Sequence, residues 1–530
     1  MRRLRRGPGS GFLFLLGILV SASVEAAAPA RPVVQRLSVM APLYIGDPEL
    51  SLDHPDNQQA WDEFRQGARL LRSVGVQSIA VDVWWGLVQR YGRQTFQWDY
   101  YDRFERILRE EGLAMSVVLS THACGDNVGD DVFIPIPDWV RQGDPETLFY
   151  KSELGNFNYE TLSPWADPKA VPLYEEFWGG FVERYVAKKD TLVSGVALSA
   201  GSAGEARAPS YNAHDRGHPH VSYPGRGVLQ TFSEPAIHDF KRYLKDRFTN
   251  SIDQLNAFLG TAFVDFEAAF AAIFPMPSAG PTAPSVPTFS IPTFSIPTFI
   301  DAKIAGGWLT TKEADLFFDW NRSTVIAHVQ RLLDGFERVR QQHVPNRDHH
   351  ELPVAIKVAG IHWGEAHRFP ELAAGLLSTS DRASWFDTEQ GFGYGPLVRG
   401  FADRCELRDG PLKLSLTCIA MEDRSVSPTS HAGSLSRGFF RAVDQVAVRK
   451  GGENALGEEL GLMSAQEILM RHVTESEIQA ITLLRFEDML GDDVKGARRK
   501  KVLSHPRGRN DAALGLCARL LALPGSRAKT

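Results

Sequence analysis

The sequence predicts an α/β fold of the (β/α)8 TIM barrel type, with long loops at the carboxyl-terminal face of the barrel. Short apolar runs rich in β-branched residues recur along the chain, and helical patterns fill the intervals between them. Strands that alternate with helices run parallel, and eight such units close into a barrel. The eight runs are Leu37–Leu43, Val76–Val83, Leu113–Ser120, Leu192–Ser199, Leu352–Val358, Leu412–Cys418, Val443–Val448 and Ala480–Leu484.

The intervals between the runs carry apolar residues at helical spacing. Trp61, Phe64, Ala68 and Leu71 fall on one face, and Gly75 ends that pattern. The spacing recurs at Tyr101, Phe104, Ile107 and Leu108, and again at Tyr174, Phe177 and Phe181. These patterns predict amphipathic helices that pack one face against the barrel.

Two stretches depart from this repeat. About 150 residues separate the fourth and fifth runs, far more than one crossover needs. They include Pro284–Phe299, where a proline every five residues forbids a helix and disfavours a central strand. We interpret about 275–300 as a low-complexity surface insertion in a catalytic domain of residues 33–495; a strip that binds a polymer or a partner is the alternative. Residues 496–530 read as a solvated basic tail.

The N-terminus has the features of a secretory signal peptide, residues 1–28. A basic start precedes the apolar stretch Phe12–Val20, which is too short to span a bilayer, and small residues around Ala26 suit a cleavage site. We therefore expect a secreted protein, extracellular or periplasmic; a transit peptide to a plastid is the alternative. No later run has the length of a membrane helix, so no membrane association is expected after signal removal.

Composition restricts the class of partner. The 530 residues are 43% hydrophobic and 23% charged, as in globular proteins, and the formal net charge is −6. Such a small charge argues against nucleic acid or an anionic membrane and favours an uncharged or small ligand. Four cysteines are too few for a disulfide scaffold, and the pairing of any one bridge stays open. We expect a monomer. The cysteines are Cys124, Cys405, Cys418 and Cys517.

Polar residues gather at one end of the predicted strands. Seven of the eight runs end in, or lead directly into, a polar group, and in a barrel these ends converge on the face where such enzymes carry out chemistry. Each residue alone is compatible with an ordinary loop side chain, but the coincidence favours a site. In chain order the groups are Asp82, the segment "THACGDNVGDD", Glu205, Lys357 with His362, Thr417, Glu453 and Arg485.

The residue types point to hydrolysis of a glycosidic bond. Glu205 and Glu453 belong to the fourth and seventh strands, which face each other across a ring of eight. Two opposed carboxylates without a cluster of metal ligands suit acid/base catalysis, in which one donates a proton and the other activates water. Small residues around Glu205, in "SAGSAGEARAPSY", leave room for a ligand.

Two further features fit this interpretation. Trp84, Trp85, Trp139 and Trp363 lie near the strand ends, either as platforms for sugar rings or as ordinary core residues. Residues 125–131, "GDNVGDD", read as a mobile lid with glycine hinges. A calcium loop is the rival interpretation, but the EF-hand spacing and its terminal glutamate are missing.

At this point the chain resembles the β-amylases, the inverting exo-hydrolases of starch in glycoside hydrolase family 14, and bacterial members more than plant ones. The resemblance runs from about Val39 to Asp488. Its blocks are "VDVWWGLV", "STHACGDNVGDDVFIPIPDWV", "SAGEARAPSY", "KVAGIHW", "LTCIAMED", "GGENAL" and "LLRFEDML".

The resemblance implies a role for each matched residue. Glu205 is the general acid and Glu453 the general base. Asp82, His122 and Asp130 hold the non-reducing glucose unit, and Lys357 and His362 bind sugar on the leaving side. Thr417 belongs to a second mobile loop, and the pocket is completed by Asn454, Ala455 and Arg485. The implied reaction releases β-maltose from the non-reducing ends of α-1,4-glucans.

Departures from the family pattern leave a second hypothesis open. Ala206, Ala208 and Ala420 stand where the family usually has Leu, Tyr and Glu, so a catalytically weak or inactive glucan-binding protein is the alternative. A barrel glycosidase with a retaining mechanism is a third interpretation. Some bacterial members bind calcium after the "DVWWG" block, but Gln89 and Arg93 occupy the matching positions here. We therefore expect no metal and no cofactor.

Overall fold

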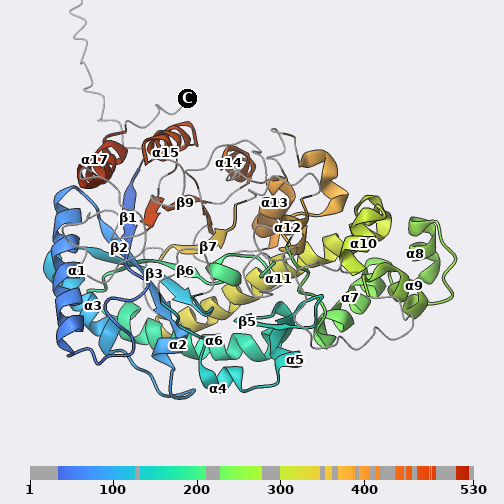
Figure 1. Ribbon diagram of the computed structural model, residues 1–530, viewed down its shortest axis with the longest axis horizontal. Helices are drawn as coiled ribbons and strands as arrows, with labels where there is room; N and C mark the ends of the chain where they lie inside the picture. Colours follow the sequence, from blue (N-terminus) through green and yellow to red (C-terminus); the bar gives the residue numbers. More distant parts are fainter. Residues whose placement is uncertain are drawn as a thin grey trace, which may run out of the picture.

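The computed structural model describes most of the chain between residues 34 and 523 (Figure 1). The described residues are 34–125, 132–210, 227–276, 299–345, 352–360, 368–385, 387, 393–404, 412–417, 419, 436–446, 449–455, 462–476, 478, 480–484 and 509–523. The signal peptide, residues 126–131 of the predicted lid (125–131) and residues 277–298 of the predicted insertion (about 275–300) lie outside them, and all three stay predictions.

Within the described residues, eight strands close into a barrel in the order β1-β10-β9-β8-β7-β6-β3-β2. Each strand pairs in parallel with both neighbours, so all carboxyl ends lie on one face. The predicted (β/α)8 barrel is thereby confirmed. Its strands are β1 (Arg36–Met40), β2 (Ser78–Trp84), β3 (Ala114–Ser120), β6 (Val193–Leu198), β7 (Val354–Val358), β8 (Lys413–Leu416), β9 (Arg449–Ala455) and β10 (Ala480–Leu484).

The seventh strand was predicted in the wrong place. The expected strand Val443–Val448 begins inside helix α14 (Ser436–Asp444), and the strand is β9, "RKGGENA", further along the chain. Two glycines and few β-branched residues give β9 a weak propensity for strand. It forms because β8 and β10 supply backbone partners on both sides. Glu453 therefore lies within the strand rather than after it.

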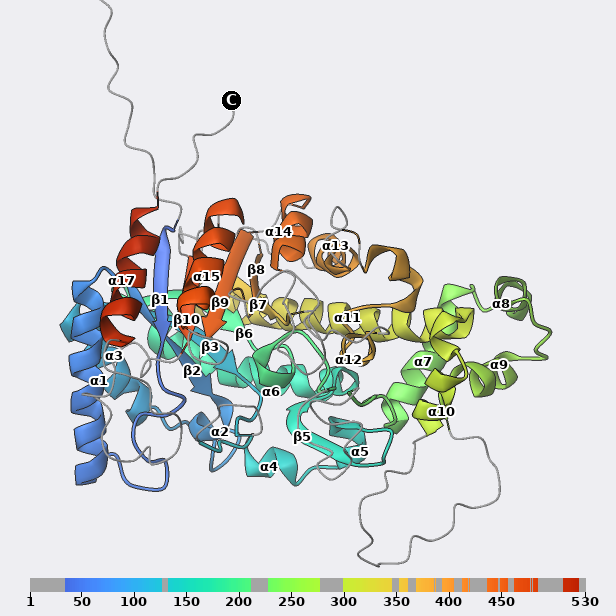
Figure 2. The same ribbon diagram turned by 45° about the horizontal axis from the view of Figure 1, so that its top comes forward.

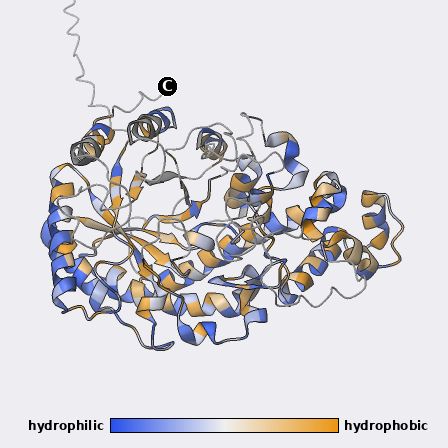
Figure 3. Ribbon diagram, in the orientation of Figure 1, coloured by the Kyte–Doolittle hydropathy of each residue, from blue (hydrophilic) through white to orange (hydrophobic). Residues whose placement is uncertain are grey.

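The predicted amphipathic helices cover the barrel. Helix α1 (Pro55–Ser73) buries Trp61, Phe64 and Leu71, as its apolar spacing predicts. Helix α3 (Asp99–Glu111) ends at Gly112, whose φ of 70° gives the left-handed cap that glycine adopts at low cost. Figure 3 shows mainly hydrophobic strands inside the barrel and mixed colouring on α1. The remaining cover includes α6 (Asp167–Phe181) with the π-turn η2 (Val182–Val186), and α11 (Lys312–His343).

Two insertions enlarge the carboxyl-terminal face. The first, between β3 and β6, contains a hairpin that the sequence patterns did not predict, β4 (Phe149–Lys151) with β5 (Phe157–Leu162). Its short helices are α4 (Asp138–Arg141), α5 (Pro145–Leu148) and η1 (Pro164–Ala166). The second, between β6 and β7, projects to one side of the barrel (Figure 2). It contains η3 (Ser202–Gly204), α7 (Glu234–Arg247), α8 (Ile252–Leu259), α9 (Phe266–Ile273), α10 (Phe299–Ala305) and η5 (Trp308–Thr310).

The end of the chain corrects a second prediction. Residues 509–522 of the expected solvated tail form α17 (Arg509–Ala522), whose Leu516, Cys517 and Leu520 are buried in the main core. The apolar residues at helical spacing in this segment therefore pack against the core, although a basic run precedes them. The other helices are α2 (Trp85–Val88), α12 (Phe369–Ala373), η6 (Thr379–Ser384), α13 (Tyr394–Arg404) and α15 (Leu462–Ser476).

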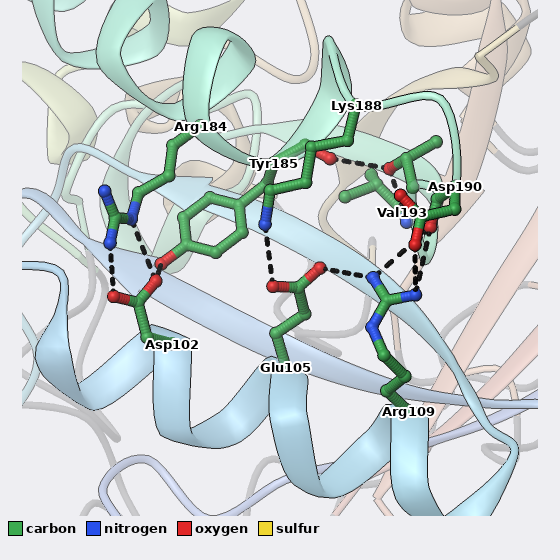
Figure 4. Close-up of polar contacts among 9 residues, drawn as sticks. Asp102, Glu105, Arg109, Arg184, Tyr185, Lys188, Asp190 and Val193 are labelled. Carbon is green, nitrogen blue, oxygen red and sulfur yellow. Dashed lines mark hydrogen bonds and ion pairs between the residues drawn. The ribbon is translucent and has the colours of Figure 1, made fainter.

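A network of ion pairs fixes the start of β6 to α3 (Figure 4). Asp102 accepts hydrogen bonds from Arg184 Nε at 2.8 Å and from the Tyr185 hydroxyl at 2.7 Å. Glu105 accepts from Arg109 and Lys188, both at 2.9 Å. These contacts join α3 to the π-turn and to the connection that enters β6. They anchor the amino end of the strand whose other end presents Glu205.

Two further observations concern the described part of the chain. Cys124 and Cys517 are buried, whereas Cys405 and Cys418 lie outside the described residues. None of the described helices combines the length with the apolar character that crossing a bilayer requires.

Candidate active site

A tight turn carries the chain from β6 to Glu205. Gly201 has Arg207 O and Glu205 O so close that a Cβ would lie 2.2 Å and 2.7 Å from them. Gly204 has a φ of 76°, and a Cβ there would lie 3.1 Å from His122 Cε1. Ala203 adopts a φ of 55°, which is unusual for a residue with a side chain. The small residues are therefore needed because the turn folds back on itself against the imidazole of His122.

The carboxylate of Glu205 is held by two neighbours. Arg207 Nε donates to Oε2 at 2.6 Å, and the Thr417 hydroxyl donates to Oε1, also at 2.6 Å. The Arg207 side chain is 2% exposed and that of Glu205 is 12% exposed. Glu205 also forms a β-bridge with Lys357 of β7, and the Ala206 amide donates to Lys357 O at 2.8 Å. The fourth, fifth and sixth barrel strands thus meet at Glu205.

Asp82 and His122 lie at the ends of β2 and β3. The Ser120 hydroxyl donates to Asp82 Oδ1 at 2.6 Å, and His122 Nδ1 is 2.8 Å from Ser199 Oγ. Burial lowers the pKa of His122 to about 4, although the nearby carboxylate of Glu160 opposes the shift. His122 is therefore a neutral imidazole near neutral pH, able to hydrogen-bond an uncharged ligand.

The structure places the other predicted site residues to different extents. Lys357 is buried within β7. For Glu453, Asn454 and Ala455 the backbone of β9 is described, with Glu453 in register with Thr482 of β10. The side chains of these three residues are not described. Asp130, His362 and Arg485 lie outside the described residues. So do Trp363 and Ala420, the latter being one of the three positions that differ from the family pattern.

Two residues that the sequence interpretation missed contact this region. Arg207 lies two residues after Glu205 in the same motif, and a basic residue so close to a candidate acid is a usable signal. Glu160, on β5, accepts hydrogen bonds from the turn that precedes Glu205. No sequence signal identifies Glu160, because the hairpin that carries it was not predicted.

The tryptophans next to β2 do not all favour the sugar-platform interpretation. Trp85 is fully buried against Trp139 and Tyr174, and its indole N–H donates to Gln89 Oε1 at 2.6 Å. It is therefore a core residue, and the stacking hypothesis is wrong for it. Trp84 is also buried, but its ring lies edge-on to His122 with centroids 5.3 Å apart.

Gln89 and Arg93, at the positions that match a calcium site in some bacterial family members, contact other protein groups. Gln89 accepts from Trp85 and donates to Arg93 O, and the Arg93 side chain pairs with Glu176. Across the described residues, no group of three or more His, Cys, Asp or Glu side chains is arranged to hold a metal ion.

A carboxylate at the carboxyl end of the fourth strand, with Asp82, a neutral His122 and Lys357 on neighbouring strands and a second glutamate on β9, is the arrangement of a barrel glycoside hydrolase. The comparisons with known proteins agree. The family model of glycosyl hydrolase family 14 matches residues 39–272 and 285–504. The chain belongs to this family, the family of the β-amylases, which confirms the resemblance in its sequence.

Bacterial proteins are among the similar sequences. The chain is 27% identical over 505 residues to the β-amylase of Cytobacillus firmus, with 91% of this chain and 90% of that protein covered. It is 29% identical over 444 residues to the thermophilic β-amylase of Thermoanaerobacterium thermosulfurigenes, with 82% and 69% covered. It is 28% identical to the β/α-amylase of Paenibacillus polymyxa, with 91% of this chain covered, but spans only 35% of that protein.

A solved structure shows the same fold. The catalytic domain of β-amylase from Paenibacillus polymyxa superposes with a TM-score of 0.69 at 25% identity, over 93% of this chain and 100% of that one. A β-galactosidase from Halorubrum lacusprofundi, at 12% identity and a TM-score of 0.51, shares the fold alone; 92% of this chain and 58% of that one are covered.

Proposed function

We propose that this glycoside hydrolase is an exo-acting, inverting enzyme that cleaves α-1,4-glucosidic bonds in starch-like glucans and releases β-maltose from their non-reducing ends. The main observation is the placement of Glu205. It follows the turn after the fourth strand, contacts groups of the fifth and sixth, and is separated from Glu453 on the seventh by two strands of the ring. Membership of the β-amylase family and relatives named as β-amylases support the proposal.

The proposed reaction proceeds in one displacement. Glu205 donates a proton to the glycosidic oxygen while the bond from that oxygen to the anomeric carbon breaks. A water molecule attacks the same carbon from the opposite side and gives its proton to Glu453, so the configuration inverts. Two carboxyl groups separated by roughly 6.5–9.5 Å leave room for that water.

The contacts of Glu205 suggest which oxygen carries the proton. Oε2 is held by the buried guanidinium of Arg207, whereas Oε1 contacts the hydroxyl of Thr417. A hydroxyl can rotate and accept as well as donate, but a guanidinium only donates. Oε1 is therefore the oxygen that can hold the acidic proton while Thr417 accepts from it.

The groups around Glu205 suit a neutral sugar. In our proposal Asp82 accepts from sugar hydroxyls, and His122, uncharged near neutral pH, donates and accepts beside it. Lys357 supplies a donor on the leaving side. Asp130, His362, Thr417, Asn454, Ala455 and Arg485 keep the roles that the resemblance implies.

The test is the configuration of the released sugar. The protein is incubated with soluble starch, and the anomeric protons of the product are followed by NMR from the first minutes. β-Maltose as the initial product is expected. Initial α-maltose, or a mixture of oligosaccharides of several lengths, would overturn the proposal.

A weakly active or inactive glucan-binding protein is the second candidate. Ala206 and Ala208 are buried close to Glu205 in the sequence, at positions where the family usually has larger side chains. Fewer side-chain atoms therefore pack around the acid here. Binding of maltose in a calorimeter, with no hydrolysis of starch, would favour this candidate over the enzyme.

A further inference from the structure

Glu160 is a buried carboxylate beside the turn that leads to Glu205. It lies on β5 and is 3% exposed. Its Oε1 accepts the Ala203 backbone N–H at 2.8 Å, and its Oε2 accepts the Ser202 hydroxyl at 2.7 Å. The hairpin of the first insertion thus reaches across to the connection that follows β6.

The turn needs such support because its backbone is strained. Ala203 and Gly204 both have a positive φ, and a left-handed conformation is unfavourable for a residue with a Cβ. Two backbone hydrogen bonds close the turn, from Gly204 N to Gly201 O and from Glu205 N to Ser202 O, both at 3.0 Å. The amide of the strained Ala203 is accepted by Glu160.

Glu160 also links the turn to the neighbouring strand end. Its backbone oxygen accepts the amide of Ala123 at 2.7 Å, directly after His122. Gly204 in turn packs against the His122 ring. One residue of the hairpin therefore fixes the backbone on both sides of the contact between His122 and the turn.

We propose that Glu160 is a positioning residue that holds the 201–204 turn in the conformation that presents Glu205 to the glycosidic oxygen. It acts through the turn and does not itself touch the reacting atoms. The inference rests on the proposed function, because it takes Glu205 as the general acid.

This role makes a prediction that general destabilisation does not. A misplaced acid slows the cleavage of bonds whose leaving group must be protonated, but has little effect when the leaving group departs without a proton. The two substrates are therefore maltotetraose, whose leaving sugar needs a proton, and α-maltosyl fluoride, whose fluoride needs little help. The measured quantity is the ratio of the two kcat values.

The main variant is Glu160→Leu, which fills similar space and accepts no hydrogen bond. We expect kcat for maltotetraose to fall by ~10- to 100-fold, because a shift of about 1 Å in a catalytic group has effects of this size. Turnover of α-maltosyl fluoride should stay within ~3-fold of the wild type. The KM for maltotetraose should change less than its kcat.

Two further substitutions at the same position sharpen the test. Glu160→Gln should restore the wild-type ratio, because its amide oxygen can accept from Ala203 while its NH2 group donates to the Ser202 hydroxyl. Glu160→Asp keeps the charge but is one methylene shorter, so it should show the selective loss at a smaller size. If the Leu variant does not fold, the ratio of the two kcat values is measured on the Asp variant instead.

Glu153→Leu is the matched control. Glu153 lies between β4 and β5, is 9% exposed, and accepts a backbone N–H from Leu229 at 3.0 Å, away from the turn. Its loss should leave the ratio unchanged. Equal falls on both substrates for Glu160→Leu, or no fall on either, would overturn the inference alone. A wild-type protein inactive on both substrates would overturn the proposed function and this inference with it.

Discussion

The two ends of β6 carry ion pairs of similar chemistry but different surroundings. At the amino end, Arg184 pairs with Asp102 and Arg109 with Asp190, in the network drawn in Figure 4. The Arg184 side chain is 43% exposed. At the carboxyl end, Arg207 pairs with Glu205 and is 2% exposed. One strand thus joins a solvated network to a buried pair.

The difference shows that burial, rather than residue type, separates a scaffold contact from a site contact. A pair shared with water stabilises little, because solvent screens it and offers alternative partners. Removing one partner of a buried pair lowers the stability of the protein strongly, because the remaining charge is buried with neither its partner nor water. The buried pair can therefore fix the orientation of Glu205, whereas the exposed network fixes where the strand begins.

The largest effect expected at the buried end is the loss of catalysis in Glu205→Gln. The amide cannot donate the proton, so kcat for maltotetraose should fall by ~10²- to 10⁴-fold. Initial rates of maltose release measure the change, at a temperature where circular dichroism shows that the variant is folded. The thermal midpoint should fall, because the buried guanidinium of Arg207 loses its carboxylate partner. A variant with wild-type rates would show that Glu205 is not the acid.

The second prediction compares the two arginines directly. Arg207→Met should lower the free energy of unfolding by roughly 3 kcal/mol, because it leaves a buried carboxylate without its partner. Arg184→Met, at the exposed end, should lower it by less than about 1 kcal/mol. Urea denaturation followed by circular dichroism measures both. Equal losses would mean that burial does not distinguish the two ends.

The third prediction uses pH at the buried end. The pKa of His122 is about 4 in the folded protein, against 6.5 for an ordinary histidine, because burial disfavours the charged form. As the pH falls from 6.5 to 4, the unfolded chain takes up a proton that the folded protein does not. Stability should therefore drop over this window, by on the order of 3 kcal/mol, with no further contribution below pH 4.

A substitution isolates that contribution from the other titrating groups. The difference in unfolding free energy between the wild type and His122→Gln, measured from pH 4 to 7, should follow the histidine alone. If this difference is constant with pH, His122 is not the buried neutral group that the structure indicates.

The smallest effect concerns two glycines with positive φ. Gly204→Ala and Gly155→Ala should each lose about 1 kcal/mol of stability through backbone strain. Only the Cβ at position 204 meets another group, His122, whereas that at 155 meets nothing within 4 Å. Activity should therefore fall in Gly204→Ala alone. A comparable fall in Gly155→Ala would remove the link to His122.

Much of this architecture could be predicted from local patterns, and the failures have physical causes. The first six strands and the last have apolar runs that match their burial, so their positions followed from periodicity. The position of strand β9 was predicted wrongly because "RKGGENA" forms a strand through pairing with its two neighbours, not through the strand propensity of its own residues. Helix α17 was not predicted because the basic run before it was taken to continue as a solvated tail, although the residues that follow have apolar side chains at helical spacing.

For the site, sequence patterns were enough to identify the candidate acids, the polar residues at the strand ends and the run of small residues before Glu205. These are local properties, set by residue type and by the place of each residue after a strand. The contacts of Arg207 and Thr417 with the two oxygens of Glu205, and of Glu160 with the preceding turn, became apparent only in the folded chain. Glu160 and Ser202 are 42 residues apart in the chain, and only the closure of the barrel with its hairpin insertion brings such groups together.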